Sequence, residues 1–287
     1  MKDVFAGYYL PSEDDYKRLW QEGLIVLDTN VLLDSYRLPA SAREDLLSVL
    51  DLVKERLWIP YQVALEYQRR RLTVISEERK GTESIVNRSK ELLEDIKRSI
   101  QSLEMDKRGL GISTEKLLEE LKVFGDRLVE TLETVHKSQL DIGHSDPVRE
   151  RLDVILAGKV GPAPVSEEDL TVLIEAGDAR YENKIPPGYS DANKEKNPAE
   201  ASFFHDGLKY DRKFGDLILW RQIIDYAKKH NKKSVMLVTS DRKEDWWWRE
   251  KGMTVGPRPE LVREIKKKAE VDLFWIDLPP ESSLNLT

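Results

Sequence analysis

The sequence predicts an α/β fold in which a long helical hairpin is inserted into a domain built on a mostly parallel sheet. Short apolar runs alternate with helical segments near both ends of the chain, which is typical of a parallel sheet with helices on both faces. Between them, residues 62–140 have helical periodicity but are too many and too polar for an ordinary crossover. In addition, 40% of the 287 residues are hydrophobic, which is enough for a packed core.

The first part of the chain has the pattern of a strand, a helix and a second strand. Residues 24–27 are an apolar run that ends at Asp28, which predicts a buried strand. Apolar residues at helical spacing predict a helix over residues 41–54, and a short strand is expected at residues 56–59. Pro60 then permits a helix to begin near Gln62, because a proline lacks only an N–H that a helix start does not use.

The middle of the chain predicts an antiparallel pair of helices. One apolar stripe with steps of three and four residues consists of Leu92, Ile96, Ile100 and Leu103. A second stripe consists of Leu117, Leu121, Phe124, Leu128, Leu132 and Val135. Gly109 and Gly111 lie between the stripes and suit a turn. We therefore expect a charged helical arm, whose role as an RNA clamp, a dimerisation element or a docking site for a protein partner is left open.

The last part of the chain returns to an α/β pattern. Its predicted elements are helices over residues 147–157 and 166–180, a polar loop over residues 185–198, a buried helix over residues 216–230, a strand over residues 234–238, a helix over residues 257–269 and a closing strand over residues 271–276. We therefore divide the chain into residues 1–61 and 146–287, which form two parts of one α/β domain, and residues 62–145, which form the arm and carry Glu66 at their start.

Composition excludes several classes of protein. The chain has no cysteine, so disulfides, thiolate metal sites and cysteine nucleophiles are excluded. No apolar run approaches the ~20 residues of a membrane helix, and residues 1–20 do not have the pattern of a secretory signal. We expect a cytoplasmic protein without a membrane partner. The net charge of −7 argues against binding nucleic acid through bulk charge alone, although metal ions can supply positive charge locally.

Two predicted strands lead into an acidic residue, Asp28 and Asp241. Ligands of open parallel sheets bind outside the carboxyl ends of the strands, so both carboxylates are expected to face one crevice. Their mutual repulsion at neutral pH is costly unless cations lie between them. Oxygen ligands select hard ions such as Mg²⁺ or Mn²⁺.

Four motifs in order resemble those of the PIN-domain family. They are Asp28-Thr29-Asn30, the segment from Pro60 to Glu66, the segment from Gly215 to Trp220, and Val238-Thr239-Ser240-Asp241. The chain is most similar to a larger bacterial PIN-like group that has a charged helical insertion. The further motifs that carry this similarity are Pro187-Gly188-Tyr189-Ser190-Asp191, Asp245-Trp246-Trp247 and the segment from Gly256 to Leu261. The resemblance covers about residues 1–80 and 180–280 and leaves most of the arm unexplained.

The resemblance implies a three-layer PIN-like fold and a metal-dependent endoribonuclease. It implies that Asp28, Glu66, Asp216 and Asp241 bind one or two Mg²⁺ or Mn²⁺ ions and carry the catalysis. The ions would activate water and neutralise charge on the attacked phosphate, which requires no histidine or cysteine. By the same resemblance, RNA is favoured over DNA as substrate, the products carry 5′-phosphate and 3′-hydroxyl ends, and a role in RNA turnover or bacterial defence, for example as a toxin, is suggested.

Other residues have both a functional and a structural interpretation. Asn30 and Thr239 either orient the carboxylates or cap local turns. Arg212 and Lys213 are placed to hold substrate phosphates, or belong to a solvated helix face. Asp28 and Asp216 also suit turn or cap positions, while Asp191 and Asp245 are candidates to join the site. The three tryptophans Trp246, Trp247 and Trp248 invite a base-stacking role, but packing under the sheet is favoured.

Two other functions compete with the nuclease. A catalytically silent or partner-activated binding module would use the arm to engage a partner, but a decayed nuclease usually loses an acid, and this chain keeps all four. A phosphatase of the haloacid dehalogenase type would have a second aspartate two residues after the first, where this chain has Asn30. Glycine-rich nucleotide-binding loops are absent from the sequence, which argues against a nucleotide-binding protein or kinase.

Overall fold

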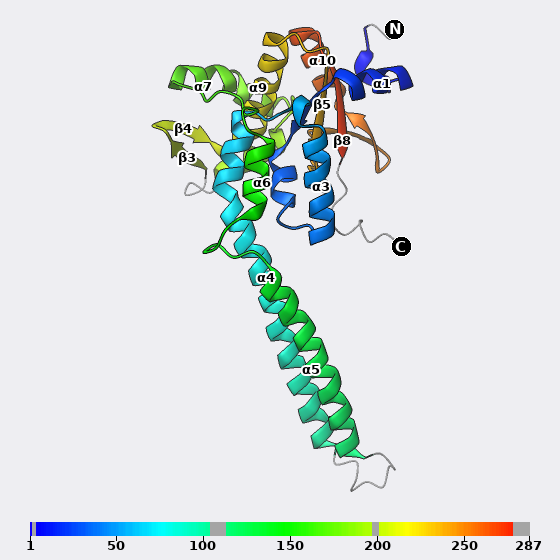
Figure 1. Ribbon diagram of the computed structural model, residues 1–287. Coiled ribbons are helices and arrows are strands. Elements are labelled where there is room, and N and C mark those ends of the chain that lie inside the picture. Colours follow the sequence, from blue (N-terminus) through cyan, green and yellow to red (C-terminus); the bar gives the residue numbers. More distant parts are fainter. Residues whose placement is uncertain (2–3, 104–112, 197–200, 278–287) are drawn as a thin grey trace. The chain divides into compact units, whose positions relative to one another are not determined.

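The computed structural model describes residues 1, 4–103, 113–196 and 201–277 (Figure 1). The chain divides into two compact units. Unit 1 comprises Met1–Arg69 and Pro147–Thr287, and unit 2 comprises Arg70–Asp146. The turn predicted at Gly109 and Gly111 lies outside the described residues.

Unit 1 is built on a four-stranded parallel sheet with the strand order β2-β1-β5-β8. These strands are β1 (Leu24–Leu27), β2 (Leu57–Trp58), β5 (Ser234–Thr239) and β8 (Asp272–Asp277). Every residue of β1 is buried, because the strand is central and both of its faces are covered. Two antiparallel hairpins accompany the sheet and were not predicted, namely β3 (Ser202–His205) with β4 (Leu208–Asp211) and β6 (Trp247–Glu250) with β7 (Met253–Pro257).

The helices of unit 1 connect these strands. They are α1 (Glu13–Glu22), α2 (Thr29–Asp34), α3 (Ala40–Leu52), α6 (Pro147–Ile155), α7 (Glu167–Ile174), α8 (Gly177–Glu182), α9 (Gly215–Lys229) and α10 (Pro259–Ala269), with short 3-10 helices η1 (Ala6–Tyr8), η2 (Lys54–Arg56), η3 (Tyr189–Lys196) and η4 (Arg212–Phe214). The chain leaves β1 through α2 and α3 toward β2, and leaves β5 through α10 toward β8 on the other side. Right-handed crossovers in opposite directions place their helices on opposite faces. The predicted α/β fold with a mostly parallel sheet is confirmed.

The predicted strands at residues 24–27, 56–59, 234–238 and 271–276 are all present; the first has the predicted bounds, and no end of the others shifts by more than one residue. The prediction of one helix over residues 166–180 is wrong, because Ala176 has a left-handed backbone with φ 56° that separates α7 from α8. The next residue is a glycine for a steric reason. A Cβ on Gly177 would lie 2.5 Å from the ring of Phe214.

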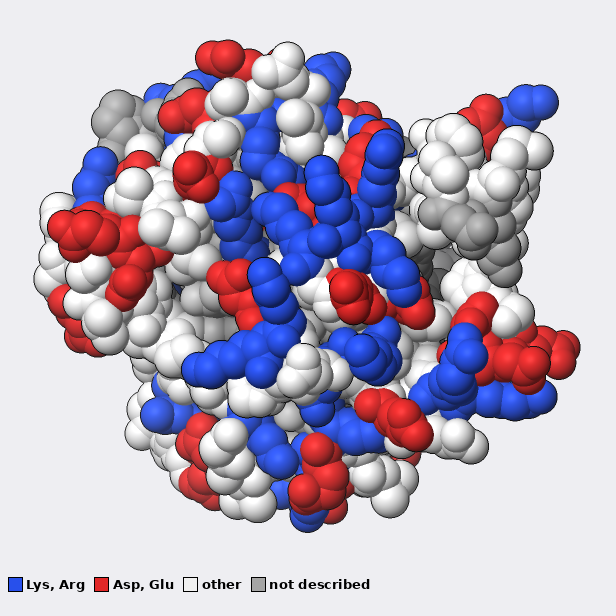
Figure 2. Space-filling model, turned by 90° about the horizontal axis from the view of Figure 1, so that it is seen from above, with Lys and Arg blue, Asp and Glu red and all other residues white. Residues whose placement is uncertain are grey.

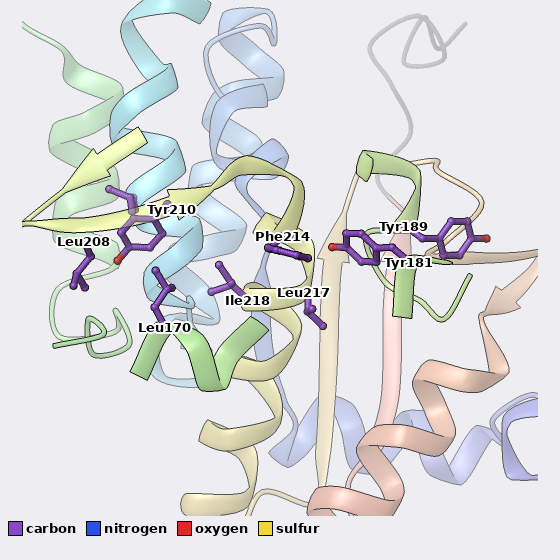
Figure 3. Close-up of a cluster of buried hydrophobic side chains, with 9 residues drawn as sticks. Leu170, Tyr181, Tyr189, Leu208, Tyr210, Phe214, Leu217 and Ile218 are labelled. Carbon is purple, nitrogen blue, oxygen red and sulfur yellow. The ribbon is translucent and has the colours of Figure 1, made fainter. Parts of the chain in front are cut away.

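A cluster of buried apolar side chains fixes the start of α9 (Figure 3). Its members are Leu65, Leu170, Tyr181, Tyr189, Leu208, Tyr210, Phe214, Leu217 and Ile218. The ring centroids of Tyr181 and Phe214 are 5.4 Å apart, and the Tyr181 hydroxyl donates a hydrogen bond of 2.9 Å to the carbonyl oxygen of Lys213. The first turn of α9 is therefore held from both its apolar and its polar sides.

Unit 2 contains most of α4 (Tyr61–Ser102), whose first turns belong to unit 1, and all of α5 (Thr114–Ser138). Ser113 caps α5 by accepting a hydrogen bond from the backbone N–H of Lys116 at 3.2 Å. Among the described residues, no helix combines the length and the apolar character that crossing a membrane requires.

One buried and one exposed leucine of α3 allow the packing of this helix to be tested. Leu47 is 1% exposed and Leu52 is 84% exposed. We expect Leu47→Ala to lower the free energy of unfolding by about 2–5 kcal/mol, because it leaves a cavity in the core. The matched Leu52→Ala is expected to change it by less than about 0.5 kcal/mol. Urea unfolding of both variants measures the difference, and equal effects would contradict the packing described for α3.

Candidate active site

The site lies where the strand order of the sheet reverses, between β1 and β5. Asp28 directly follows β1, and Asp241 comes two residues after the end of β5. The two strand ends are tied together, since the backbone N–H of Asp28 donates to the carbonyl oxygen of Val238 at 3.0 Å. This reversal point is where open α/β sheets form their ligand crevice.

The Asp28 carboxylate is held by three donors. It accepts hydrogen bonds from the backbone N–H of Thr29 at 2.6 Å, from Asn30 Nδ2 at 2.6 Å and from Thr239 Oγ1 at 2.7 Å. Asn30 is fixed in turn, because its Oδ1 accepts the backbone N–H of Ser240 at 2.9 Å. Asn30 and Thr239 therefore orient the carboxylate, and the half-buried Asp28 also caps α2.

Glu66 lies against the start of α9, whose first turn carries Asp216. Asp216 is the second residue of the helix, which has no side-chain cap, so Asp216 does not act as its N-cap. A Cβ on Gly215 would lie 2.7 Å from Glu66 Oε1, which places that carboxylate against the start of the helix. Gln62, one turn earlier on α4, donates to the same Oε1 at 2.7 Å. A carboxylate at a helix N-terminus is favoured by the helix dipole.

Lys243 lies among three carboxylates. Its Nζ is 3.1 Å from Asp191 Oδ2, 3.2 Å from Asp216 Oδ2 and 3.1 Å from Asp241 Oδ2. Burial alone would lower the pKa of Lys243, but the charges of Asp216, Asp241 and Asp191 raise it above its usual value. The ammonium therefore stays charged and acts as the counter-ion of the three aspartates.

Asp245 anchors a neighbouring loop. It is fully buried, and its Oδ2 accepts the backbone N–H groups of Gly188 at 3.0 Å and of Ser190 at 2.9 Å. Gly188 has a φ of 95°, and a Cβ there would lie 3.2 Å from the Cβ of Asp216 and closer still to the Tyr181 hydroxyl. Only glycine allows the loop to approach Asp216 this closely. Asp245 thus positions the loop that packs against Asp216.

Two of the three tryptophans donate hydrogen bonds to the acidic residues. Trp246 Nε1 donates to Asp216 Oδ2 at 3.2 Å, and Trp247 Nε1 donates to the carbonyl oxygen of Asp241. Both side chains are buried, which confirms the expectation that they pack within the protein. Trp248 is partly exposed, and its ring packs edge-on against Tyr8 with centroids 5.6 Å apart.

The acids interact strongly with one another. The pKa of Asp28 is raised to about 7, first by burial and then by the charges of Asp216 and Asp241, against the lowering effect of the Thr239 hydrogen bond. Asp28 is therefore poised between its neutral and charged forms near neutral pH. Additional positive charge at the site would favour the ionised form.

The donor set fits a hard divalent ion in its chemistry. All donors are oxygens, hydrogen bonds fix their orientation, and they already hold one cation, the Lys243 ammonium. In the part of the chain that the structure describes, no three acidic or histidine side chains are close enough together to share one ion.

Two predicted phosphate-binding residues lie in η4, directly before α9. Arg212 is exposed, whereas Lys213 Nζ pairs with Asp178 Oδ1 at 2.7 Å and lies 4.9 Å from the centroid of the Phe214 ring. Sequence reasoning missed Lys243 and the support that Trp246 gives to Asp216. The available sequence signal was the position of Lys243 two residues after Asp241. In the structure, Asp241 caps this turn by accepting a hydrogen bond from the backbone N–H of Lys243 at 2.7 Å.

Comparison with known proteins gives one match. A family model described as a PIN like domain matches residues 24–261. The matched span contains every residue of the site, from Asp28 to the tryptophans that follow Asp241. No curated protein matches the chain, and no solved structure does.

The raised pKa of Asp28 predicts a pH-dependent stability. Because its folded pKa of about 7 exceeds the usual 3.8, the folded state is favoured while Asp28 is protonated, and this contribution is lost as pH rises from about 4 to above 7. In chelator, we expect the wild type to lose more unfolding free energy between about pH 5 and about pH 8 than Asp28→Asn. Urea unfolding at both pH values measures this.

Mg²⁺ or Mn²⁺ provides the control for this pH experiment. A divalent ion held by the ionised carboxylates should restore the stability of the wild type at the higher pH but should have little effect on Asp28→Asn. Parallel pH profiles of the two proteins in chelator would show that Asp28 does not titrate as described.

Proposed function

The chain belongs to the PIN-like domain family, and on that premise we propose that it is a metal-dependent endonuclease that hydrolyses phosphodiester bonds, with RNA as its preferred substrate. PIN-like domains generally have the fold of metal-dependent nucleases. The preference for RNA follows from the resemblance of the motifs to larger PIN-like proteins. The proposed ligands are Asp28, Glu66, Asp216 and Asp241, with Mg²⁺ or Mn²⁺ as the cofactor.

One observation carries the proposal. Three carboxylates from distant parts of the chain converge at the reversal point of the sheet so closely that Asp216 and Asp241 raise the pKa of Asp28. Such repulsion costs stability, so a purely structural role is a poor explanation for it. A site that binds cations and a phosphate accounts for the cost.

The side chains of the site divide the work of catalysis. A divalent ion bound at these oxygens supplies a Lewis acid that neutralises the phosphate and makes water more acidic. Asn30 and Thr239 hold the Asp28 carboxylate in one orientation, and Trp246 does the same for Asp216. Gln62 holds Glu66 at the start of α9. These supports fix the acids before substrate arrives, which reduces the reorganisation that the reaction requires.

Basic residues lie at the end of the sheet where β5 and β8 begin, opposite the candidate site, and they suit a polyanionic partner. The helices α9 and α10 end in basic residues and lead into the adjacent strands β5 and β8, where the Asp272 N–H donates to the Lys233 carbonyl oxygen at 2.9 Å. Figure 2, seen from above, shows Lys and Arg side chains gathered on this side of the molecule. The exposed basic residues at these helix ends include Lys228, Lys229, Lys233 and Lys267. A nucleic acid longer than the active site would gain phosphate contacts there.

Lys243 favours a second candidate, a nuclease that is silent until a substrate or protein partner activates it. In the described conformation its ammonium already lies within 3.2 Å of Asp191, Asp216 and Asp241 and offsets part of their charge. An ion at these oxygens must compete with a tethered cation. A partner that draws Lys243 away would then raise the affinity of the site for metal.

Substitution of the acids tests the proposal. We expect Asp28→Asn and Asp216→Asn to reduce cleavage of labelled single-stranded RNA by more than the about 10–100-fold expected for Thr239→Val, because the acids are proposed ligands and Thr239 supports one. Asp153→Asn, at an exposed acid of α6, should cleave normally. Cleavage is measured with Mg²⁺, Mn²⁺ or chelator, with single-stranded DNA in parallel. A folded Asp28→Asn protein with full activity would contradict the assignment of Asp28 as a catalytic metal ligand.

The basic residues at the ends of α9 and α10 give a separate prediction. We expect the variant with Lys228, Lys229, Lys233 and Lys267 all changed to Gln to bind long RNA more weakly, with a log–log salt slope reduced by about 0.7 for each lysine that contacts a phosphate. Cleavage of a short oligonucleotide should not change. Fluorescence anisotropy in chelator measures binding without cleavage. Lys17→Gln with Lys54→Gln serves as the control, since these lysines pair with Asp14 and Asp51.

A further inference from the structure

The two helices of unit 2 pack against each other along one face of each. Two contacts define these faces. Thr82 Oγ1 lies 3.0 Å from His136 Nδ1, and a Cβ on Gly125 would lie 3.0 Å from Leu93 Cδ1. At the border of the contact, Lys90 Nζ lies 2.6 Å from Glu133 Oε1. Residue numbers fall along α5 as they rise along α4, so the helices are antiparallel.

Each helix also carries a second apolar stripe that these contacts do not use. On the α4 side it consists of Ile85, Leu92, Ile96 and Leu103, and on α5 it consists of Leu117, Phe124, Leu128 and Val135. Both stripes have steps of seven, four and seven residues, which is the spacing of a coiled-coil seam. The side chains are open to solvent. Ile85 is 54% exposed, Phe124 is 61% exposed, and the others are at least partly exposed.

The two stripes lie on the same flank of the hairpin. Leu92 immediately precedes Leu93, and Phe124 immediately precedes Gly125, so each stripe is rotated by about 100° in the same sense from the face that contacts the other helix. Equal rotations about antiparallel axes bring both stripes to one side. We name this side, made by the eight residues of the two stripes, the apolar flank.

The other flank is polar throughout. Rotation in the opposite sense gives the positions of Glu83, Asn87, Lys90, Glu94, Lys97 and Gln101 on α4, and of Glu119, Lys122, Asp126, Glu130, Glu133 and Lys137 on α5. Several of these residues form ion pairs, such as Lys97 with Glu94 at 3.3 Å. The hairpin therefore has a polar side that faces water and an apolar side that suits an apolar partner.

We propose that the apolar flank binds the same flank of a second copy of this chain, so that two hairpins form a four-helix bundle. The seam has one spacing on both helices, which makes the face complementary to itself under a two-fold axis. Asp95 and Arg127 border the flank about one helical turn apart, because the contact of Gly125 with Leu93 sets the register of the two helices. A two-fold axis along the arm would bring Asp95 of one copy within about one turn of Arg127 of the other.

The size of the flank matches what a dimer needs. The 25 residues of α5 span about 37 Å at about 1.5 Å per residue, and two adjacent helices are about 20 Å wide. This gives roughly 700 Å² for each copy, close to the roughly 800 Å² that each partner contributes to a stable interface. Exposed apolar stripes that run along a whole hairpin are unusual in a monomer. The inference is independent of the proposed nuclease activity.

The oligomeric state of the full chain tests the proposal. By light scattering after size exclusion and by sedimentation velocity, from about 1 to about 100 µM, we expect a dimer for the wild type. Leu92→Glu combined with Phe124→Glu should yield a monomer with the same helical circular dichroism, because both side chains are exposed and the hairpin contacts remain. Val123→Glu is the matched control, since Val123 is 66% exposed on α5 but lies outside the flank.

Three results would overturn the proposal. These are a wild type that is monomeric at the highest concentration, a double variant that remains dimeric, and a Val123→Glu variant that dissociates as readily as the double variant. Nuclease activity does not enter any of these readings, so a failure here leaves the proposed function untouched.

Discussion

The repulsion between carboxylates at the reversal point of the sheet is the constraint on which the rest of unit 1 depends. Parallel strands bring Asp28 and Asp241 to one edge, and α9 adds Asp216. Burial and neighbouring charges raise the pKa of Asp28 to about 7. A protein can keep such a cluster only if it supplies positive charge, and Lys243 supplies it within 3.2 Å of Asp191, Asp216 and Asp241.

The supports of the acids come from segments far apart in the sequence. Asn30 and Thr239 fix Asp28, while Trp246 holds Asp216. Asp245 fixes the loop at Gly188 that packs against Asp216. The motifs around Gly188 and from Asp245 to Trp247 thus share a physical role with Asn30 and Thr239. They hold the carboxylates in place against their own repulsion, as the surroundings of a preorganised site must.

Unit 2 is held together by apolar contacts between two helices rather than by a charged site. Its helices are joined by one apolar face and separate their remaining residues into an apolar and a charged flank. A hairpin of two helices cannot bury two stripes on each helix by itself, so the second stripe stays open to solvent in the part of the chain that the structure describes. Catalytic chemistry and self-association would then reside in separate units of one chain.

The sequence by itself determined the fold class and the four motifs. A buried strand has a continuous apolar run, and an acid directly after it must lie at the edge of a parallel sheet, so Asp28 and Asp241 could be placed from the pattern alone. Asp216 and Glu66 depended on the family resemblance, because an acid in the first turns of a helix is favoured for ordinary reasons.

Tertiary structure decided what surrounds these acids. The break between α7 and α8 depends on Gly177 meeting the ring of Phe214, a contact between residues that are far apart in the chain. The role of Lys243 depends on three carboxylates from three different segments, and its position two residues after Asp241 does not by itself reveal the other two. Periodicity records which side of a segment is apolar, but only packing determines which charges become neighbours.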